Sequence, residues 1–167
     1  MLVIRRFEET DWSQVWRILE PVFRSGETYA FSRSIQEAEA IQAWVGSSPR
    51  VYVAEIDGEV VGSYYLKPNQ PGQGGHVCNC GYVVATAWRG MGIAGKMCLH
   101  SLQEAHQLGF YAMQYNLVVS TNEDAIHLWR KMGFEVVGRL PGAFNHPGLG
   151  FVDALVMYQK LAENPVE

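Results

Sequence analysis

The sequence predicts an α/β fold in which a mixed β-sheet carries helices on its faces. Short apolar segments alternate with segments of helical periodicity, in the order β-α-α-β-β-β-α-β-α-β-β. Asp57-Gly58 lies between two apolar segments and is typical of a tight turn between antiparallel strands. A glycine-rich segment at 89–95 connects a strand to a helix. The chain of 167 residues has the usual length of one domain, so we expect a single domain over 1–167.

The composition and net charge argue against several classes of protein. Hydrophobic residues make up 48% of the chain and charged residues 18%, which excludes general disorder. A net charge of −4 lacks the basic surplus of nucleic-acid or membrane-surface binders, so we expect neither partner. There is no signal peptide and no apolar run of about 18 residues, so we expect a cytoplasmic protein. The three cysteines lack the paired spacing of metal ligands, and we expect no metal.

The N-terminal half is predicted from apolar spacing and capping residues. Residues 2–7 form a strand, and Thr10 is an N-cap for a helix of periodic apolar residues that includes Trp12 and Phe23. Pro21 predicts a kink or an early stop in that helix. Ser34 with Glu37 resembles a capping box and opens a second helix, which ends at Gly46. Two strands follow, at 51–56 and 59–66, and then a loop at 68–75.

The C-terminal half is predicted in the same way. A strand at 76–85 leads through the glycine-rich turn to a helix that ends near Leu108, with Gly109 as its terminator. After a strand at 112–119, Asn122 caps a helix that ends at Gly133. The remaining elements are two strands near 135–140 and 152–161, separated by a loop at 141–150.

The glycine-rich segment is suited to a phosphate or pyrophosphate. The first N–H groups of a helix have no partner within it and lie at the positive end of its dipole. Glycines allow a phosphate to approach these groups closely. Glycines that merely turn the chain are the simpler alternative, but they seldom accompany an arginine such as Arg89 at a helix start.

Two nucleotide-binding patterns match this segment in part. Gly90, Gly92 and Gly95 have the spacing of the dinucleotide-binding loop, which needs an acidic residue about 20 residues later. The strand at 112–119 supplies none. The NTP-binding loop needs Ser or Thr after its lysine to hold Mg²⁺, and Met97 has that position here. Both patterns, and with them a nucleotide-dependent phosphotransferase, are disfavoured.

The same segment resembles the Arg-x-x-Gly-x-Gly/Ala loop of the GCN5-related N-acetyltransferase (GNAT) superfamily, which binds coenzyme A. Segments around 122–134 and 153–157 are similar to this family's second cofactor segment and its last strand. The resemblance covers nearly the whole chain. It implies the GNAT fold, in which about four helices flank a mixed sheet of about seven strands whose central strands splay apart. It also implies an acetyl-CoA-dependent N-acetyltransferase without a metal.

The resemblance implies where acetyl-CoA binds. In this family the pantetheine arm lies between the splayed strands and pairs with the first of them. Here the pyrophosphate would bind the N–H groups of 90–95, and the N–H group of Val84 would stabilise the oxyanion. The implied cofactor-binding residues are Tyr82, Val84, Arg89, Gly90, Met91, Gly92, Ala94, Gly95 and Asn122.

The chain departs from the family pattern at two catalytic positions. Trp129 stands where many members have a tyrosine as the acid for the departing thiolate, and an indole N–H is no useful acid. The strand at 76–85 also lacks the glutamate that serves many members as a base. The amine attacks the thioester directly, so its proton must leave by His76, by a bound water, or before the amine binds.

Two asparagines in predicted strands are the candidate residues for the acceptor. Asparagine is depleted in strands, yet Asn79 and Asn116 lie on the two strands that would splay. With their neighbours they resemble the L-azetidine-2-carboxylate (proline-analogue) N-acetyltransferases. By that resemblance Asn79 is catalytic and contacts the reacting nitrogen, and the main chain of Asn116 and Leu117 binds the substrate carboxylate. The alternative is that both asparagines only satisfy backbone groups.

The loop between the first two helices is expected to cover the acceptor pocket, as it does in the family. Arg24 would pair with a carboxylate, and Glu27 and Tyr29 would shape the pocket. An exposed polar loop without such a role is the alternative.

The implied function is transfer of an acetyl group to a small-molecule amine or imino acid, such as a proline analogue, in detoxification. Another small amine, such as a phosphinothricin-like amino acid or an antibiotic, is an alternative acceptor. The missing glutamate and tyrosine also fit a non-catalytic acyl-CoA-binding sensor. An aromatic-rich surface leaves a homodimer open.

Overall fold

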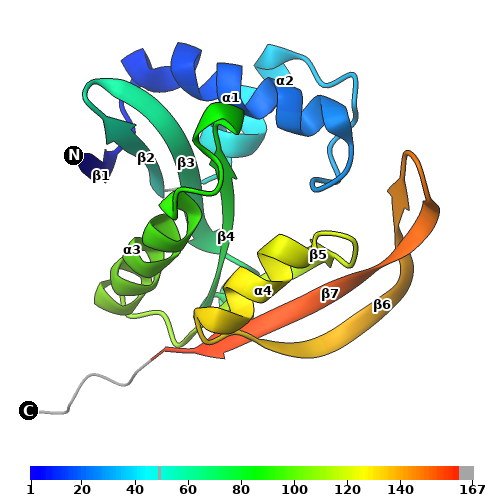
Figure 1. Cartoon of the computed structure of the whole chain (residues 1–167). Helices are drawn as coiled ribbons and strands as arrows, with labels where there is room; N and C mark the ends of the chain where they lie inside the picture. The colour runs from blue at the N-terminus through cyan, green and yellow to red at the C-terminus, as the bar shows by residue number, and fades with distance from the viewer. Residues whose placement is uncertain (49, 162–167) are drawn as a thin grey trace, which may run out of the picture.

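The computed structural model describes residues 1–48 and 50–161. The mixed sheet has seven strands, as the sequence predicts, and they lie in the order β1-β2-β3-β4-β5-β7-β6 (Figure 1). The strands are β1 (Leu2–Arg6), β2 (Arg50–Ile56), β3 (Glu59–Pro68), β4 (Val77–Val84), β5 (Ala112–Val119), β6 (Glu135–His146) and β7 (Gly150–Lys160).

Helices cover both faces of the sheet (Figure 1). Two of them pack on one face over an apolar cluster that includes Phe23, Trp44 and Val83, and the other two pack on the opposite face around Met97 and Met113. The four helices are α1 (Trp12–Ser25), α2 (Glu37–Ile41), α3 (Ile93–Gln107) and α4 (Glu123–Lys131). No helix in the described part of the chain is long and apolar enough to span a membrane.

The central strands β4 and β5 part soon after they begin to pair. They are parallel and share only two paired positions, Val77 with Ala112 and Cys78 with Met113. Beyond these positions β4 continues along β3, and β5 continues along β7. The sheet therefore opens between β4 and β5, as expected of the GNAT fold (Figure 1).

Several local predictions at helix ends are confirmed. Gly109 and Gly133 have φ angles of 83° and 102°, in the left-handed region that ends a helix. At the end of α4, the N–H of Phe134 donates to the Trp129 carbonyl at 3.0 Å. The side chain of Asn122 accepts from the Ala125 N–H and caps α4.

Predictions at the starts of α1 and α2 are wrong. Thr10 lies within a short 3-10 turn, and Asp11 is the N-cap residue of α1. The capping box before α2 is formed by Gln36 and Glu39, not by Ser34 and Glu37. Each helix starts one or two residues from its expected place, and the Asp11 side chain bonds to Arg5 and to the Glu8 N–H instead of capping α1.

Two other elements run further than the sequence predicts. Pro21 does not stop α1, which continues to Ser25. The predicted loop at 141–150 is wrong, because β6 continues to His146 and only a turn at 147–149 separates it from β7. A shift in pairing register between Leu140 and Phe144 accommodates the irregular sequence there. Pro141 is tolerated within β6 because this is the edge strand of the sheet, whose outer N–H groups need no partner.

Candidate functional site

The glycine-rich turn leaves the start of α3 open to an anion. Gly90 and Gly92 have φ angles of 75° and 78°, which other residues rarely adopt. Gly92 is the N-cap residue and has no side chain that could accept from the first helical N–H groups. The first turn of α3 also lacks an acidic residue. The N–H groups of 93–95 therefore lie at a positive helix end without compensation.

The rest of the predicted cofactor loop lies around this helix start. Arg89 and Met91 are exposed, and Ala94 and Gly95 are half-buried. A Cβ atom on Gly95 would make an ordinary van der Waals contact with Leu128 of α4, at 3.5 Å, so α3 and α4 lie close together here. The loop thus presents backbone groups and one guanidinium group to solvent at the start of α3.

The edge of β4 that faces the opening has backbone groups that β5 does not pair. The odd-numbered residues of β4 bond to β3, because the Val77 carbonyl accepts from the Asn69 N–H and the Ala85 N–H donates to Val61. The backbone groups of Tyr82 and Val84 therefore point toward the opening. The Tyr82 carbonyl accepts a hydrogen bond from the Tyr29 hydroxyl at 2.9 Å.

Asn79 bridges the two strands just beyond their last paired position. Its Nδ2 donates to the Gln114 carbonyl of β5 at 2.9 Å, and its Oδ1 accepts from the Tyr65 hydroxyl at 3.2 Å. The side chain is buried, with 7% of its surface exposed. Asn79 thus replaces a main-chain bond that the parting strands lose, and it fixes where the opening begins.

Asn116 and Leu117 form an irregularity in β5 that faces the opening. The pairing with β7 shifts register between Tyr115 and Val118, which leaves the two residues between them outside the ladder. The Asn116 side chain donates to Asn69 at 2.6 Å, on the loop before β4. Both asparagines bond to Gln114: Asn79 donates to the Gln114 main-chain carbonyl, and the side-chain Nε2 of Gln114 donates to Asn116 Oδ1 at 2.9 Å.

A buried chain of hydroxyl groups under the opening was not predicted. The Tyr115 hydroxyl donates to the Tyr82 hydroxyl at 2.9 Å, and the Tyr82 hydroxyl lies 2.6 Å from Ser101 Oγ. Ser101 Oγ donates to the Cys98 carbonyl at 2.7 Å. Burial raises the pKa of both tyrosines well above their usual value, so they stay protonated. In the sequence, the signal for this chain was a tyrosine in each of the two predicted strands, Tyr82 and Tyr115. Their hydrogen-bond partners come from distant elements and could not be predicted.

Trp129 of α4 covers this chain of hydroxyl groups. Its ring centroid lies 5.0 Å from that of Tyr82 and 5.1 Å from that of Tyr115. The aromatic rings form a continuous apolar wall along the α4 side of the opening. Trp129 therefore contributes packing area at a position where many family members would have an acid.

Two residues at the connection between α1 and α2 have different roles: Arg24 stabilises the loop, and Tyr29 reaches the opening. Arg24 donates to the carbonyls of Arg33 and Ile35, both at 3.2 Å, and pairs with Glu20. Its guanidinium group holds the loop together, and its predicted pairing with a substrate carboxylate stays a prediction. Glu27 is exposed at the tip of the loop.

Tyr29 connects this loop to β4. Its ring packs edge-on against Phe23 and Trp44, and burial raises the pKa of its hydroxyl well above the usual value. The hydroxyl therefore remains a hydrogen-bond donor to the Tyr82 carbonyl.

A hollow of about 550 Å³ lies between this loop and the tip of the β6–β7 hairpin. The loop contributes Gly26, Tyr29, Ala30, Phe31 and Arg33, and the hairpin contributes residues between Ala143 and Gly150. Because Tyr29 also contacts β4, the hollow adjoins the opening of the sheet. It is large enough for a small-molecule acceptor.

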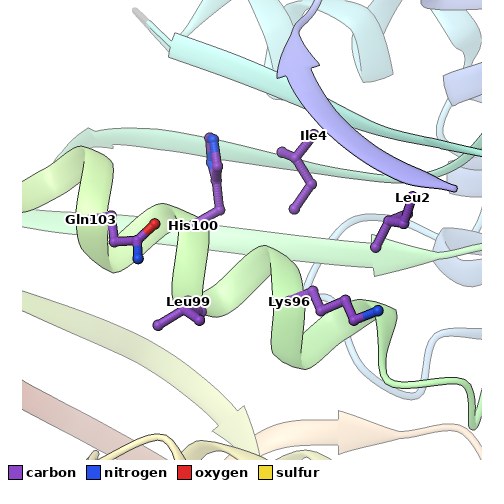
Figure 2. A pocket seen from close by; sticks show the side chains of 6 residues that line it. All are labelled: Leu2, Ile4, Lys96, Leu99, His100 and Gln103. Atoms are coloured by element: carbon purple, nitrogen blue, oxygen red, sulfur yellow. The ribbon is translucent and has the colours of Figure 1, made fainter.

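A smaller hollow of about 290 Å³ lies between α3 and β1. Figure 2 shows its lining side chains, among them Leu2 and Ile4 from β1 and Leu99 and His100 from α3. The Tyr64 hydroxyl lies 2.7 Å from His100 Nδ1, and burial lowers the pKa of this histidine. Neither hollow is lined by residues of β4 or β5, but the larger one includes Tyr29, whose hydroxyl bonds to the Tyr82 carbonyl of β4.

The fold and the site define the N-acetyltransferase class that the sequence predicts: a mixed sheet that opens between two parallel strands, beside an uncapped glycine-rich helix start. Residues 12–134 match the family model described as "Acetyltransferase (GNAT) family". The chain belongs to this family.

Similar proteins agree with this assignment. A GCN5-related N-acetyltransferase from Kribbella flavida is 37% identical, with a TM-score of 0.90 over 96% of this chain and 98% of that chain. The structure of yncA from Salmonella typhimurium with its cofactor acetyl-CoA is 21% identical, with a TM-score of 0.82 over 100% and 98% of the two chains, and this likeness shows the fold alone.

The chain is also similar to parts of two curated yeast proteins. N-acetyltransferase aca1 of Schizosaccharomyces pombe is 33% identical over 119 residues, which are 70% of this chain and 57% of that protein. Protein SPT10 of Saccharomyces cerevisiae is 28% identical over 85 residues, which are 51% of this chain and 13% of that protein. The match therefore spans little more than half of one curated relative and a small part of the other.

Proposed function

We propose that this protein transfers an acetyl group from acetyl-CoA to the nitrogen of a small-molecule amine or imino acid. The observation that carries the proposal is the opening between β4 and β5, which begins after two paired positions and ends beside the uncapped start of α3. The opening leaves room for an extended acyl carrier along β4, and the helix start suits a pyrophosphate.

The residues present fit acetyl-CoA, which supplies an activated acetyl thioester. The N–H groups of 93–95 would bind its pyrophosphate, because no side chain of the N-cap residue occupies them. Arg89, Gly90, Met91, Ala94 and Gly95 would surround that group. The backbone of Tyr82 and Val84 would pair with the pantetheine arm, and the Val84 N–H would stabilise the oxyanion. Asn122 would contact the arm from α4.

The buried groups of this site are donors and not bases. The tyrosines that face the opening have raised pKa values, and Asn79 has no basic group. A free thiol has a pKa of about 8.5, so the thiolate is an acceptable leaving group without an acid at Trp129. We therefore propose that the amine loses its proton before attack, to water in the open hollow or in solution.

We propose a proline analogue such as azetidine-2-carboxylate as the acceptor, and detoxification of such compounds as the role. The support is the sequence resemblance at Asn79 and Asn116, together with the unpaired backbone at Asn116 and Leu117. Glu27 and Tyr29 would shape the entrance. A phosphinothricin-like amino acid or an amine antibiotic is the alternative acceptor.

We also propose that one domain over 1–167 works in the cytoplasm, where thiols stay reduced. The described cysteines, Cys78, Cys80 and Cys98, are free and buried. A homodimer would cover the exposed apolar residues of the β6–β7 arm, of which Val137 is 58% and Phe151 79% exposed.

A non-catalytic acyl-CoA sensor is the second candidate function. It is favoured by the absence of a carboxylate on β4 and by Trp129 in place of an acid. It predicts binding of acetyl-CoA without transfer to any amine.

One experiment separates the two functions. Purified protein is mixed with acetyl-CoA and a panel of amines and imino acids, and the release of free thiol is followed, with binding of acetyl-CoA measured by calorimetry. Transfer to a member of the panel supports the enzyme. Binding without transfer supports the sensor, and the absence of binding contradicts both.

A further inference from the structure

We infer that the acceptor carries an anionic group, and that Arg33 binds this group in the hollow between the α1–α2 loop and the β6–β7 turn. The inference rests on the proposed function, because it assigns the acceptor to this hollow.

Arg33 is an exposed side chain whose Nε is bonded and whose two terminal nitrogens have no partner among the described residues. Its Nε donates to the Arg24 carbonyl at 2.8 Å. Its aliphatic stem lies over Gly26, where an added Cβ would meet Arg33 Cδ at 2.8 Å and Cγ at 2.9 Å. The two Nη groups make no hydrogen bond or ion pair with residues 1–48 or 50–161. A guanidinium fork with both terminal nitrogens free suits a carboxylate, phosphonate or phosphinate.

The hollow has no negative charge of its own to neutralise Arg33. Aspartate and glutamate are missing from the described residues that line it. Two acidic residues lie closest before Arg33 in the sequence. Glu20 pairs with Arg24 at 3.2 Å, and Glu27 is exposed and does not line the hollow. A cation next to an open hollow without an internal partner favours an anionic ligand.

The opposite wall of the hollow adds a hydrogen-bond donor. His146 Nδ1 accepts from the N–H groups of Gly148 and Leu149, at 3.1 and 3.2 Å. With Nδ1 used as an acceptor, Nε2 is the ring nitrogen that carries a hydrogen. His146 and Arg33 both line the hollow, and the rings of Phe31 and Phe144 supply apolar lining between polar groups.

Tyr29 relates this anion position to the reaction. It lines the hollow, and its hydroxyl bonds to the Tyr82 carbonyl on the open edge of β4. An acceptor whose anionic end is bound by Arg33 would therefore have its other end on the Tyr29 side of the hollow, which is the side that contacts β4. This assigns to Arg33 the selection of amino and imino acids over neutral amines. The unpaired backbone at Asn116 and Leu117 is the rival position for the same anionic group.

The test measures binding without a titrating amine. The N-acetyl derivatives of azetidine-2-carboxylate, proline and phosphinothricin are titrated into the protein saturated with CoA, each beside a neutral analogue whose anionic groups are amidated or esterified. We expect at least one acid to bind at least tenfold more tightly than its neutral partner. Arg33→Gln should weaken that acid at least tenfold and the neutral partner less than twofold, and Arg33→Lys should lie between. Arg17→Gln removes an equal charge from the outer part of α1 and should change neither.

The inference is overturned if every acid and its neutral partner bind equally, if no acid binds, or if Arg33→Gln leaves the preference for the acid intact. The last result would favour the backbone at Asn116 and Leu117. Unchanged binding of acetyl-CoA and an unchanged Tm show that Arg33→Gln is folded. Thiol release by the wild-type protein with the amine panel reports on the proposed function separately, so the two failures can be distinguished.

Discussion

The two helices that follow the parting strands begin in opposite ways. After β4, α3 starts at Gly92, which has a left-handed backbone and no side chain, and its first turn lacks acidic residues. After β5, α4 starts at Asn122, whose Oδ1 accepts from the Ala125 N–H, and its first turn contains Glu123 and Asp124.

The difference concerns the sign of charge that each helix start accepts. Capping groups and carboxylates compensate the positive end of the α4 dipole. The corresponding end of α3 is uncompensated and open to a diphosphate. Equivalent places in two strand–helix units therefore have different chemistry, and we propose the start of α3 as the anion site because it lacks a cap.

The largest expected effect comes from giving α3 the acidic start of α4. Gly92→Asp places a carboxylate next to the N–H groups of 93–95, where it competes with the diphosphate and repels it. We expect the Kd for acetyl-CoA to rise about a hundredfold, which is about 2.7 kcal/mol, measured by calorimetry.

Gly58→Asp is the matched control. Gly58 also has a positive φ, 86°, and a Cβ there meets no atom within 4 Å, as at Gly92. The two variants therefore carry similar backbone strain, but only Gly92 lies at α3. Equal affinities for acetyl-CoA in both variants would refute the assignment of the anion site.

Much of this comparison could be predicted from the sequence, because it depends on local chemistry. Glycine spacing and the Asn122 cap are read from neighbouring residues, and so are the strand and helix order and the stops at Gly109 and Gly133. The failures were local ambiguities, as when Asp11 and not Thr10 proved to be the N-cap residue.

Contacts between distant segments could not be predicted from the sequence. The bond from Tyr29 to Tyr82 joins residues 53 apart, and the bond from Asn79 to Gln114 joins residues 35 apart. No spacing rule predicts such pairs. The hollow next to Tyr29 also depends on the extension of β6 to His146, which was predicted as a loop.

The next effect in size concerns the point where the strands part. Asn79→Ala removes the side chain that bonds to the Gln114 carbonyl and leaves that buried group without its partner. We expect kcat to fall about tenfold and the free energy of unfolding to fall by about 1–3 kcal/mol, while the Kd for acetyl-CoA changes less than threefold. Asn116→Ala, at an exposed position, should cost less stability. A loss of cofactor affinity alone in Asn79→Ala would show that its assigned role is wrong.

A smaller effect tests whether Asn122 does more than cap α4. Asn122→Asp keeps an acceptor for the Ala125 N–H but removes the Nδ2 donor, whereas Asn122→Ala removes both. We expect both variants to weaken acetyl-CoA binding about fivefold, about 1 kcal/mol. Only the alanine variant should also lose about 1 kcal/mol of stability, measured by urea unfolding. Unchanged affinity in both would limit Asn122 to capping.

The smallest effect on binding is expected far from the opening, at the partly buried ion pair of Asp11 with Arg5. Arg5 bonds to Asp11 at 2.8 Å and lowers the pKa of this carboxyl. Because the folded pKa is lowered, the pair stabilises the fold above the usual pKa of about 3.9, and this stability is lost as the pH falls through the folded value. Asp11→Asn should therefore lower the unfolding free energy at pH 7 and flatten its decline below about pH 4. Acetyl-CoA affinity at pH 7 should be unchanged; a tenfold change would link this pair to the site.

The most direct test is a ¹H–¹⁵N NMR titration of the protein with CoA and, separately, with pantetheine, which lacks the diphosphate. The account predicts that CoA produces the largest shifts at the amides of 92–95 and that pantetheine shifts the amides of Tyr82 and Val84 but not those of 92–95. Shifts from CoA that are confined to other segments, such as the hollow between β1 and α3, would contradict it.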